Sequence, residues 1–352
     1  MAGRSSPAAA FQLALASSAL AVIGVETRVN KTFVHALLGI CLLVLSGAHA
    51  PAQQGPKLYK VGLLNPNTQA IAKNYVQAFR QELAALGYGD HNLVLEVRYA
   101  EGNRERMKDF ADEFTRLGVD VLVTPSEPAL LAARAVTTSI PIVTVSCDPL
   151  EKLVGSLNRP GGNVTGFSCV SAAAAGKRLG LLKSMSPSAS RVALLYSGAD
   201  AYEPDLRNVE ESARKLDMTV TRFPVATAAG LAPAFDSIKI DGIQLVYIQL
   251  SAFFNLHRRA IADLALRHQL PSIFGFREYP EDGGLMAYGA SNSDGYRRAA
   301  HFVDRILKGA RPGDLPAEEP MRYELVINER TAKALGLPIP YELRLQADEI
   351  LR

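Results

Sequence analysis

The stretch that decides the fold is Tyr59-Lys-Val-Gly-Leu-Leu64, which runs directly into the polar loop Asn65-Pro-Asn-Thr68. Its first part is a short apolar run, which is typical of a buried strand. Behind the loop, residues 71–86 place apolar side chains at helical spacing, and Gly87 ends the pattern. The sequence therefore predicts a strand, a polar turn and a helix, which together form the repeating unit of a parallel α/β sheet.

The same alternation continues and predicts two successive units. In the first unit, strands are predicted at 93–99, 121–124 and 141–145, and helices at 103–117 and 129–136. The turn-rich segment 158–168 then interrupts the pattern, because Pro and Gly favour turns over strands and helices. The second unit has predicted helices at 173–185, 202–216, 229–238 and 256–268, and predicted strands at 192–196, 219–224, 245–248, 271–274, 285–288 and 323–327. A further helix is predicted at 293–307, in a segment that is expected to return to the first unit.

Short connections between strands and helices favour parallel sheets with helices on both faces. We therefore predict an α/β fold of two doubly wound, Rossmann-like lobes joined by a multi-strand hinge. The first lobe is expected to span residues 57–166 plus about 289–320, and the second residues 167–288 plus about 321–352. In such folds a ligand binds between the carboxyl ends of the strands.

Residues 1–52 are predicted to be a signal segment. The apolar run 33–46 follows Arg28 and Lys31 and precedes small residues, with Ala50 and Ala52 placed for cleavage after Ala52. The run is shorter than the ~20 residues that span a bilayer. We therefore expect export to the periplasm, with a membrane tether if the segment is not cleaved. An earlier apolar stretch, 8–25, is either upstream of the true start or a first membrane-associated segment.

Composition and motifs argue against several function classes. The net charge of +3 does not favour nucleic-acid binding. Neither a phosphate-binding P-loop nor a dinucleotide-binding glycine turn follows a predicted strand, so we expect no nucleotide cofactor. Four histidines follow the signal segment, at positions 91, 257, 268 and 301, and their scatter predicts no metal site. The Ser212-x-x-Lys215 pair lies in a charged helix, which favours chance over catalysis.

Polar residues at the carboxyl ends of the predicted strands are the candidate ligand contacts. We expect them to share one cleft, although several could instead cap helices. In the first unit they are Asn65, Asn67, Thr68, Thr124, Ser126, Glu127, Ser146 and Asp148. In the second unit they are Ser197, Gln249, Ser251, Glu278 and Tyr288.

The charges among these residues favour a zwitterionic solute. Asp148 and Glu278 would suit an ammonium group, and the neighbouring Arg277 would suit a carboxylate. An amino acid carries both groups. Cys147 and Cys169 could form a disulfide in an oxidising compartment, but their spacing alone does not establish one.

Several segments of the sequence resemble those of a known family. They are Ser156-Leu-Asn-Arg-Pro-Gly-Gly-Asn-Val-Thr-Gly166, Gly284-Leu-Met-Ala-Tyr-Gly289, Arg305-Ile-Leu-Lys-Gly309, Leu325-Val-Ile-Asn328 and Thr331-Ala-Lys-Ala-Leu-Gly-Leu337. In this order they resemble the ABC transporter substrate-binding protein family. The branch is an uncharacterised periplasmic type that is related to tryptophan- and tyrosine-binding proteins. The resemblance covers about residues 57–350.

The resemblance implies a type I periplasmic-binding fold and delivery of a small solute to an ABC permease in the inner membrane. It also implies ligand contacts from residues 65–68, 124–127 and 146–149. The sequence departs from the family pattern at Pro125-Ser-Glu127 and Ser146-Cys147, so tryptophan is not carried over as the solute.

We thus expect a monomeric, non-catalytic solute-binding protein for an amino acid or related small organic solute. Two alternatives stay open at this stage. One is a ligand-sensing ectodomain, and the other is an exported α/β hydrolytic enzyme.

Overall fold

The computed structural model describes residues 57–146, 154, 156–168, 172–198 and 203–352. The predicted signal segment, Cys147, Asp148 and Cys169 lie outside the described residues. The chain divides between Gly55 and Pro56, and the fold below is that of Pro56–Arg352.

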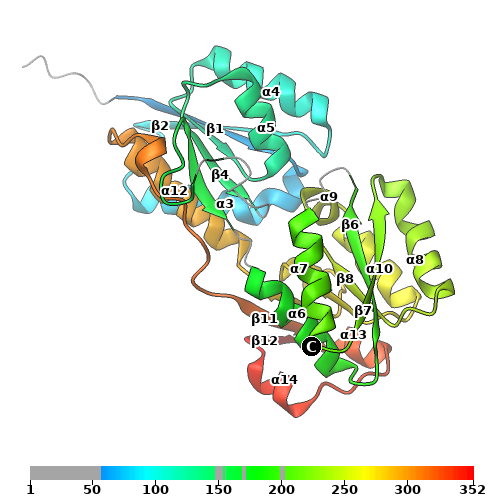
Figure 1. Cartoon of the computed structure of the whole chain (residues 1–352). Helices are drawn as coiled ribbons and strands as arrows, with labels where there is room; N and C mark the ends of the chain where they lie inside the picture. The colour runs from blue at the N-terminus through cyan, green and yellow to red at the C-terminus, as the bar shows by residue number, and fades with distance from the viewer. Residues whose placement is uncertain (1–56, 147–153, 155, 169–171, 199–202) are drawn as a thin grey trace, which may run out of the picture. The chain divides into compact units, whose positions relative to one another are not determined.

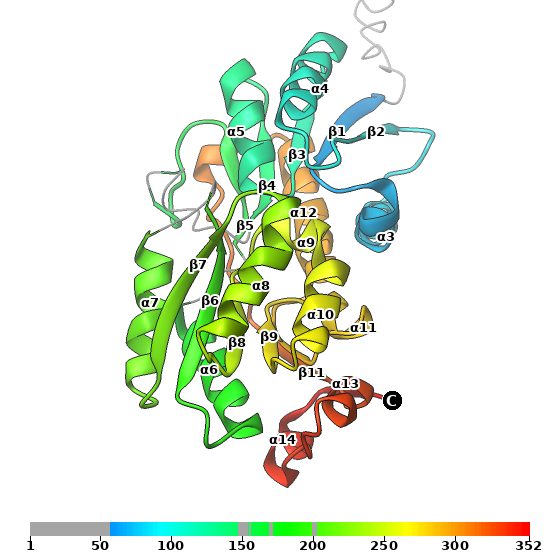
Figure 2. The ribbon, with the colours of Figure 1, turned by 90° about the vertical axis from the view of Figure 1, so that its right-hand side faces the viewer.

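A five-stranded parallel sheet forms the centre of the first lobe, in the order β2-β1-β3-β4-β5 (Figure 1). Helices α3 and α12 cover one face of this sheet, and α4 and α5 cover the other (Figure 2). The strands are β1 (Tyr59–Asn65), β2 (Leu93–Tyr99), β3 (Val121–Thr124), β4 (Ile142–Ser146) and β5 (Val164–Ser168). The helices are α3 (Gln69–Ala85), α4 (Arg104–Leu117), α5 (Glu127–Val136) and α12 (Asn292–Leu307).

Helix α12 returns from the late part of the sequence to pack beside α3. Its apolar face buries Phe302 and Val303 completely, in one cluster with Val76 and Phe79 of α3. Burying side chains of this size contributes ~1.5–3 kcal/mol each. This packing explains why the sequence after Tyr288 rejoins the first lobe.

A seven-stranded sheet forms the second lobe, in the order β12-β11-β10-β9-β8-β6-β7. All of its strand pairs are parallel except β10 with β11. Its strands are β6 (Arg191–Ser197), β7 (Thr219–Val225), β8 (Leu245–Ile248), β9 (Ser272–Phe274), β10 (Met286–Gly289), β11 (Glu324–Asn328) and β12 (Glu349–Leu351). Its helices are α6 (Ala172–Met185), α7 (Glu203–Arg214), α8 (Leu231–Ile240), α9 (Ala252–Leu256), α10 (Arg258–Arg267), α11 (Glu278–Glu281), α13 (Glu329–Ala334) and α14 (Tyr341–Gln346).

The helices of the second lobe cover both faces of its sheet. Helices α6 and α7 pack on one face, and α8 and α10 on the other (Figure 2). Alternate residues of β6 feed the two cores: Val192 and Leu194 face the α6 side, whereas Ala193 and Leu195 face the α10 side. This alternation is the two-residue period of a strand that is covered on both faces.

The strand order of each sheet reverses at one point, and these points position the site. In the first sheet β1 lies between β2 and β3, so the chain winds outward in opposite directions from β1 and β3. In the second sheet the reversal lies between β6 and β8. Loops diverge at such a point and leave a crevice at the carboxyl ends of the strands.

The predicted fold class is confirmed, including two lobes with parallel sheets, whereas some predicted elements were wrong. The segment 158–168 is not solely a crossing, because β5 within it forms the edge of the first sheet. The helix predicted at 256–268 is α10, and the short helix α9, which was not predicted, precedes it and meets it at His257. The lobe boundaries stay a prediction.

The chain passes between the two sheets three times among residues 164–324, after β5, after β10 and before β11. Two of these crossings pair with each other. Phe167 and Glu318 form a parallel bridge, in which Glu318 N donates to Gly166 O at 2.9 Å and Ser168 N donates to Glu318 O at 2.8 Å. Among the described helices, none is long and apolar enough to cross a membrane.

Candidate functional site

A small cavity lies where loops of the two lobes meet at these reversal points. Its free volume is about 40 Å³. The first lobe contributes the β1–α3 loop, the β3–α5 loop and α12, and the second lobe contributes the β8–α9 and β9–α11 regions. The lining residues are Pro66, Asn67, Tyr75, Pro125, Ser126, Val145, Ser251, Ala252, Asn255, Phe276, Asn292 and Tyr296.

Three buried polar side chains of this lining have an atom without a hydrogen-bond partner. The amide oxygens of Asn67 and Asn255 and the hydroxyl of Tyr75 are all buried and unpaired. Asn67 and Asn255 are each 6% exposed, and Tyr75 is 3% exposed. An unpaired buried polar atom costs ~1–3 kcal/mol, and such atoms are uncommon in folded proteins. Their gathering around one cavity indicates a place for a polar solute.

Helix N-termini add partial positive charge beside the cavity. Ser126 caps α5 by accepting a hydrogen bond from Ala129 N at 3.2 Å. Ser251 accepts one from Phe254 N at 3.1 Å at the start of α9. Asn292 begins the long helix α12. Each serine hydroxyl keeps its own proton to donate, and a helix N-terminus favours a negatively charged group.

Asn65 supports the site from behind. It is fully buried at the end of β1, and its Nδ2 donates to the hydroxyl of Tyr296 at 2.8 Å. Its Oδ1 accepts from Asn67 N at 3.0 Å. The ring of Tyr296 lies 5.5 Å from that of Tyr75. Asn65 therefore fixes the loop that carries Asn67 and the ring that supports Tyr75, rather than lining the cavity itself.

Glu278 lies beside the Tyr75 hydroxyl, across the meeting of the lobes. Its Oε2 is buried and has no hydrogen-bond partner. Burial raises the pKa of the Glu278 carboxyl above its ordinary value, and Glu281 adds to the rise, while Tyr75 and Arg258 act in the opposite direction. Burial and the neighbouring Glu278 charge together raise the pKa of Tyr75. Tyr75 and Glu278 thus form an edge of the site that is rich in hydrogen-bond acceptors and partly shielded from water.

The remaining predicted residues of the first lobe surround the cavity without lining it. Thr68 caps α3 and accepts from Ile71 N at 3.3 Å. Thr124 is fully buried, and its Oγ1 is unpaired. Glu127 lies in the first turn of α5, and Ser146 is buried at the end of β4.

In the second lobe, Ser197 and Gln249 join the ends of β6 and β8, since Ser197 N donates to Gln249 Oε1 at 3.3 Å. Tyr288 does not line the cavity. Its ring stacks on Tyr323 at 5.6 Å, and its carbonyl accepts from Arg178 Nε at 2.7 Å.

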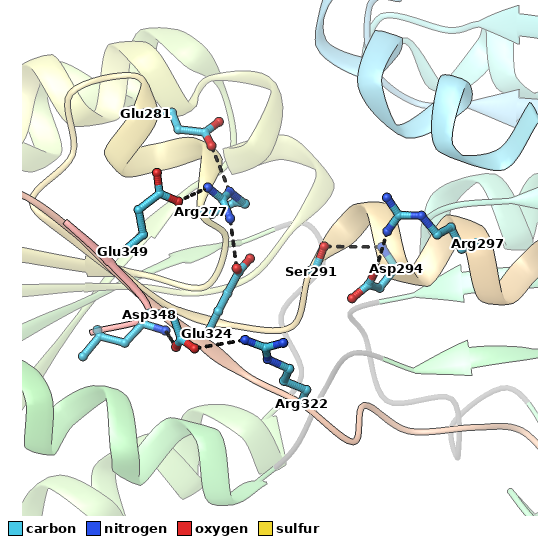
Figure 3. A network of polar contacts seen from close by, with 10 residues as sticks. Arg277, Glu281, Ser291, Asp294, Arg297, Arg322, Glu324, Asp348 and Glu349 are labelled. Carbon is cyan, nitrogen blue, oxygen red and sulfur yellow. Dashed lines mark hydrogen bonds and ion pairs between the residues drawn. The ribbon is translucent and has the colours of Figure 1, made fainter. Parts of the chain in front are cut away.

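Arg277 is engaged elsewhere and does not face a solute (Figure 3). Its guanidinium donates to Glu281 at 2.9 Å, to Glu324 at 3.0 Å and to Glu349 at 2.5 Å. These three carboxylates come from α11, β11 and β12, so Arg277 ties the last strands of the sheet to α11. The interpretation of Arg277 as a carboxylate ligand was therefore wrong.

Sequence analysis missed four lining residues with polar side chains: Tyr75, Asn255, Asn292 and Tyr296. Asn255 and Asn292 each lie in the first turns of a helix that follows a strand, so extending the search by one helical turn would have included them. Tyr75 and Tyr296 face each other from helices that lie 221 positions apart in the sequence. No local pattern encodes that contact.

The serine hydroxyls of the cavity are not arranged as nucleophiles. Among the described residues, neither Ser126 nor Ser251 is hydrogen-bonded to a histidine or a carboxylate, as activation of a serine requires. Within the same part of the chain, no group of three or more His, Cys, Asp or Glu side chains could hold a metal ion.

Known proteins share this fold and sequence. The tyrosine-binding protein of Clostridioides difficile (strain R20291) is 25% identical over 290 residues, which cover 81% of each chain. The structure of an ABC domain in complex with L-Trp from Streptococcus pneumonia has a TM-score of 0.79 at 22% identity, over 84% of this chain and 100% of that one. A conserved domain protein from Vibrio cholerae O1 biovar eltor has a TM-score of 0.78 at 26% identity, with the same coverage.

The family itself is established by the match of residues 64–351 to the sequence model of the ABC transporter substrate binding protein. Members of this family bind a small molecule and work with an ABC permease. With the two-lobed fold and the polar cavity between the lobes, this match shows that the chain belongs to the ABC transporter substrate-binding protein family.

Proposed function

We propose that the protein captures an α-amino acid, or a closely related small zwitterion, between its lobes and delivers it to an ABC importer. The observation that carries the proposal is the set of unpaired buried atoms on Asn67, Asn255 and Tyr75 around one cavity. Closure is expected to be of the hinge type, with the solute stabilising the closed state.

The polar groups around the cavity suit both charged groups of an amino acid. An ammonium group has three donors and no acceptor, which suits the unpaired oxygens of Asn67 and Asn255 and the Glu278 carboxylate nearby. A carboxylate suits the hydroxyls of Ser126 and Ser251 at their helix N-termini. The ligands named for the two relatives above, tyrosine and L-Trp, support the same class.

We further propose that the protein is exported, acts in the periplasm as a monomer, and has neither catalytic activity nor a nucleic-acid partner. The absence of an activated nucleophile among the described cavity residues favours binding over hydrolysis. A sensing protein would use the same cavity. Stimulation of the importer's ATPase distinguishes import from sensing. In vesicles that carry the permease and its ATPase, the loaded protein is expected to stimulate ATP hydrolysis.

A thermal-shift screen tests the proposed solute class. Protein freed of bound solute by unfolding and refolding is expected to melt several degrees higher with some L-α-amino acids. Binding to the native state alone stabilises it by ~2.7 kcal/mol at 100 times Kd. The matching amine without a carboxylate and the acid without an amine should produce little shift. If these truncated analogues work equally well, the zwitterion is not what the cavity recognises.

Asn255→Ala tests whether the unpaired amides contact the solute. Because the Asn255 oxygen has no partner in the protein, its removal should leave the free energy of unfolding nearly unchanged. It should weaken solute binding by about tenfold or more, as expected for a hydrogen bond to a charged group. Asn92→Ala is the matched control, because it removes the hydrogen bonds of Asn92 to Gly89 N and Gly87 O in the turn before β2, at the end of the sheet away from the cavity, and should cost ~1 kcal/mol of stability without affecting affinity. Equal affinities for Asn255→Ala and Asn92→Ala would argue against the site.

A further inference from the structure

Tyr75 connects the buried Glu278 carboxyl to the cavity. Glu278 begins α11 in the second lobe and is not one of the lining residues. Tyr75 belongs to α3 of the first lobe, lines the cavity, and has its hydroxyl beside the Glu278 carboxyl. Neither the Tyr75 hydroxyl nor Glu278 Oε2 has a well-formed hydrogen bond within the described chain. The state of one group therefore determines which hydrogen bond the other can make.

The positive charges around Glu278 are already engaged. Arg258 of α10 is the cation that acts on the Glu278 carboxyl. Its Nε donates to Asp282 Oδ2 at 2.7 Å, and both of these side chains are largely buried. Arg277, the preceding residue, is held by the three carboxylates described above. Neither cation is therefore free to neutralise an ionised Glu278.

The other ionisable groups near α11 supply no positive charge. Burial raises the pKa of the Glu278 carboxyl, and Glu281 on the same helix raises it further. Helix α11 also packs against β10 and β11, where Tyr288 stacks on Tyr323 and Glu324 is held in an ion pair. A buried carboxyl without a free cation keeps its proton to a higher pH than an exposed glutamate does.

The protonation state of Glu278 sets what Tyr75 offers to the cavity. A protonated carboxyl donates its hydrogen to the tyrosine oxygen, which leaves the tyrosine O–H free to donate into the cavity. An ionised carboxylate accepts the tyrosine O–H, which leaves a lone pair of the tyrosine oxygen toward the cavity. The lone pair suits an ammonium group, which has donors only, and the negative charge behind it adds attraction.

Resting on the proposed function, we propose that Glu278 is a proton switch for solute capture and acts through Tyr75. When the ammonium group enters, the protonated Glu278 carboxyl gives its proton to the solvent, and the Tyr75 O–H turns from the cavity to the carboxylate. The only covalent bond that breaks is the O–H bond of Glu278. Glu278 is thus a positioning residue, and binding of the solute releases a proton.

Calorimetry of the unmodified protein tests the proton release. The solute is the L-α-amino acid that gives the largest thermal shift, starting from L-tyrosine and L-tryptophan. Between pH 4.5 and pH 7 its ammonium and carboxylate keep their charges, so a change in affinity comes from the protein. Affinity should rise with pH by up to about tenfold per pH unit, as expected for one proton, and level off once Glu278 is ionised.

The same titration in two buffers of different ionisation enthalpy should show that protons are released on binding. Proton uptake, or an affinity that does not change with pH, would overturn the inference. Neither measurement depends on the folding of a variant.

Glu278→Gln assigns the effect to the carboxyl. Glutamine has nearly the same shape but does not titrate, so the variant should bind with an affinity that is independent of pH and should release no proton. Glu342→Gln is the matched control, since Glu342 is exposed on α14 and does not line the cavity, and it should keep the full pH dependence. If Glu278→Gln still releases the proton, another group such as His257 titrates, and the inference fails.

Tyr75→Phe tests whether the effect passes through the hydroxyl. The variant keeps the Glu278 carboxyl but lacks the group that faces the cavity, so it should lose most of the pH dependence. Retention of the full dependence would mean that Glu278 acts on the solute directly, which contradicts the role given to Tyr75.

This inference and the proposed function fail in different ways. Binding of an amino acid without proton release would contradict the inference alone. Failure of the unmodified protein to bind any α-amino acid, together with unchanged melting in the thermal-shift screen, would contradict the proposed function as well.

Discussion

At the scale of single residues, the site is defined by groups that the fold leaves unpaired. Other polar side chains of the described residues have partners within the protein: Asn65 bonds to Tyr296 and Asn67, and Arg277 bonds to three carboxylates. Asn67 and Asn255 are as deeply buried as core residues, yet their amide oxygens have no partner. The unpaired oxygens lower the stability of the solute-free protein. A solute that donates hydrogen bonds to them would offset this loss.

The buried Glu278 carboxyl gives a pH dependence that belongs to the same scale. Because its pKa is raised in the folded protein, mainly by burial, the folded state holds the proton to a higher pH than the unfolded state does. Stability contributed in this way is fully present below the unfolded pKa and is lost as the pH rises through the folded pKa.

Glu278→Gln should remove that decline, since glutamine does not titrate. Urea unfolding of the solute-free protein between pH 4 and pH 8 checks it. The stability of the variant relative to the original chain should increase with pH over this range. A difference that is constant with pH would show that Glu278 titrates alike in the folded and unfolded states.

At the scale of elements, one glycine explains why β5 was missed. Gly166 has a φ of +146°, and a Cβ added to it would lie 2.0 Å from the carbonyl oxygen of Thr144 on β4. The position therefore demands glycine within a strand, where glycine is unfavourable and normally indicates a turn. Because turn-forming residues surround Gly166, this segment was predicted to be a crossing between the lobes. In the structure the backbones of β4 and β5 instead approach closely and pair as strands.

Gly166→Ala should destabilise the protein by ~2 kcal/mol or more, because the new methyl group must displace the edge strand. Gly180→Ala serves as the control. Gly180 lies within α6, where an added Cβ meets nothing within 4 Å, so alanine should stabilise the helix by up to ~1 kcal/mol. Thermal or urea unfolding measures both. A Gly166→Ala protein as stable as the original would contradict the account of β5.

At the scale of the whole molecule, the order of the longer strands and helices was predictable because most of them have a clear hydrophobic period, whereas β5 and the short helices α9 and α11 were not predicted. The loops at the carboxyl ends of the strands were predictable for the same reason, and Asn67, Ser126 and Ser251 indeed line the cavity. The contributions of Tyr75, Asn292 and Tyr296 depend on α12 packing against α3, which is a tertiary contact. The sequence could not show which polar residues would remain unpaired, because that depends on where the folded chain places their hydrogen-bond partners.

The function depends on the arrangement of both lobes, because neither lobe alone encloses the cavity. Asn67 belongs to the first lobe and Asn255 to the second, so a solute that bonds to both links the lobes and favours their approach. In the proposed hinge closure, the three crossings between the sheets would serve as the hinge.

A crystal structure of the protein with a bound amino acid tests this claim most directly. We predict that the ammonium group bonds to the amide oxygens of Asn67 and Asn255 and that the carboxylate meets Ser126 and Ser251. An amino acid bound outside this cavity, or one that leaves both amides unpaired, would contradict the account.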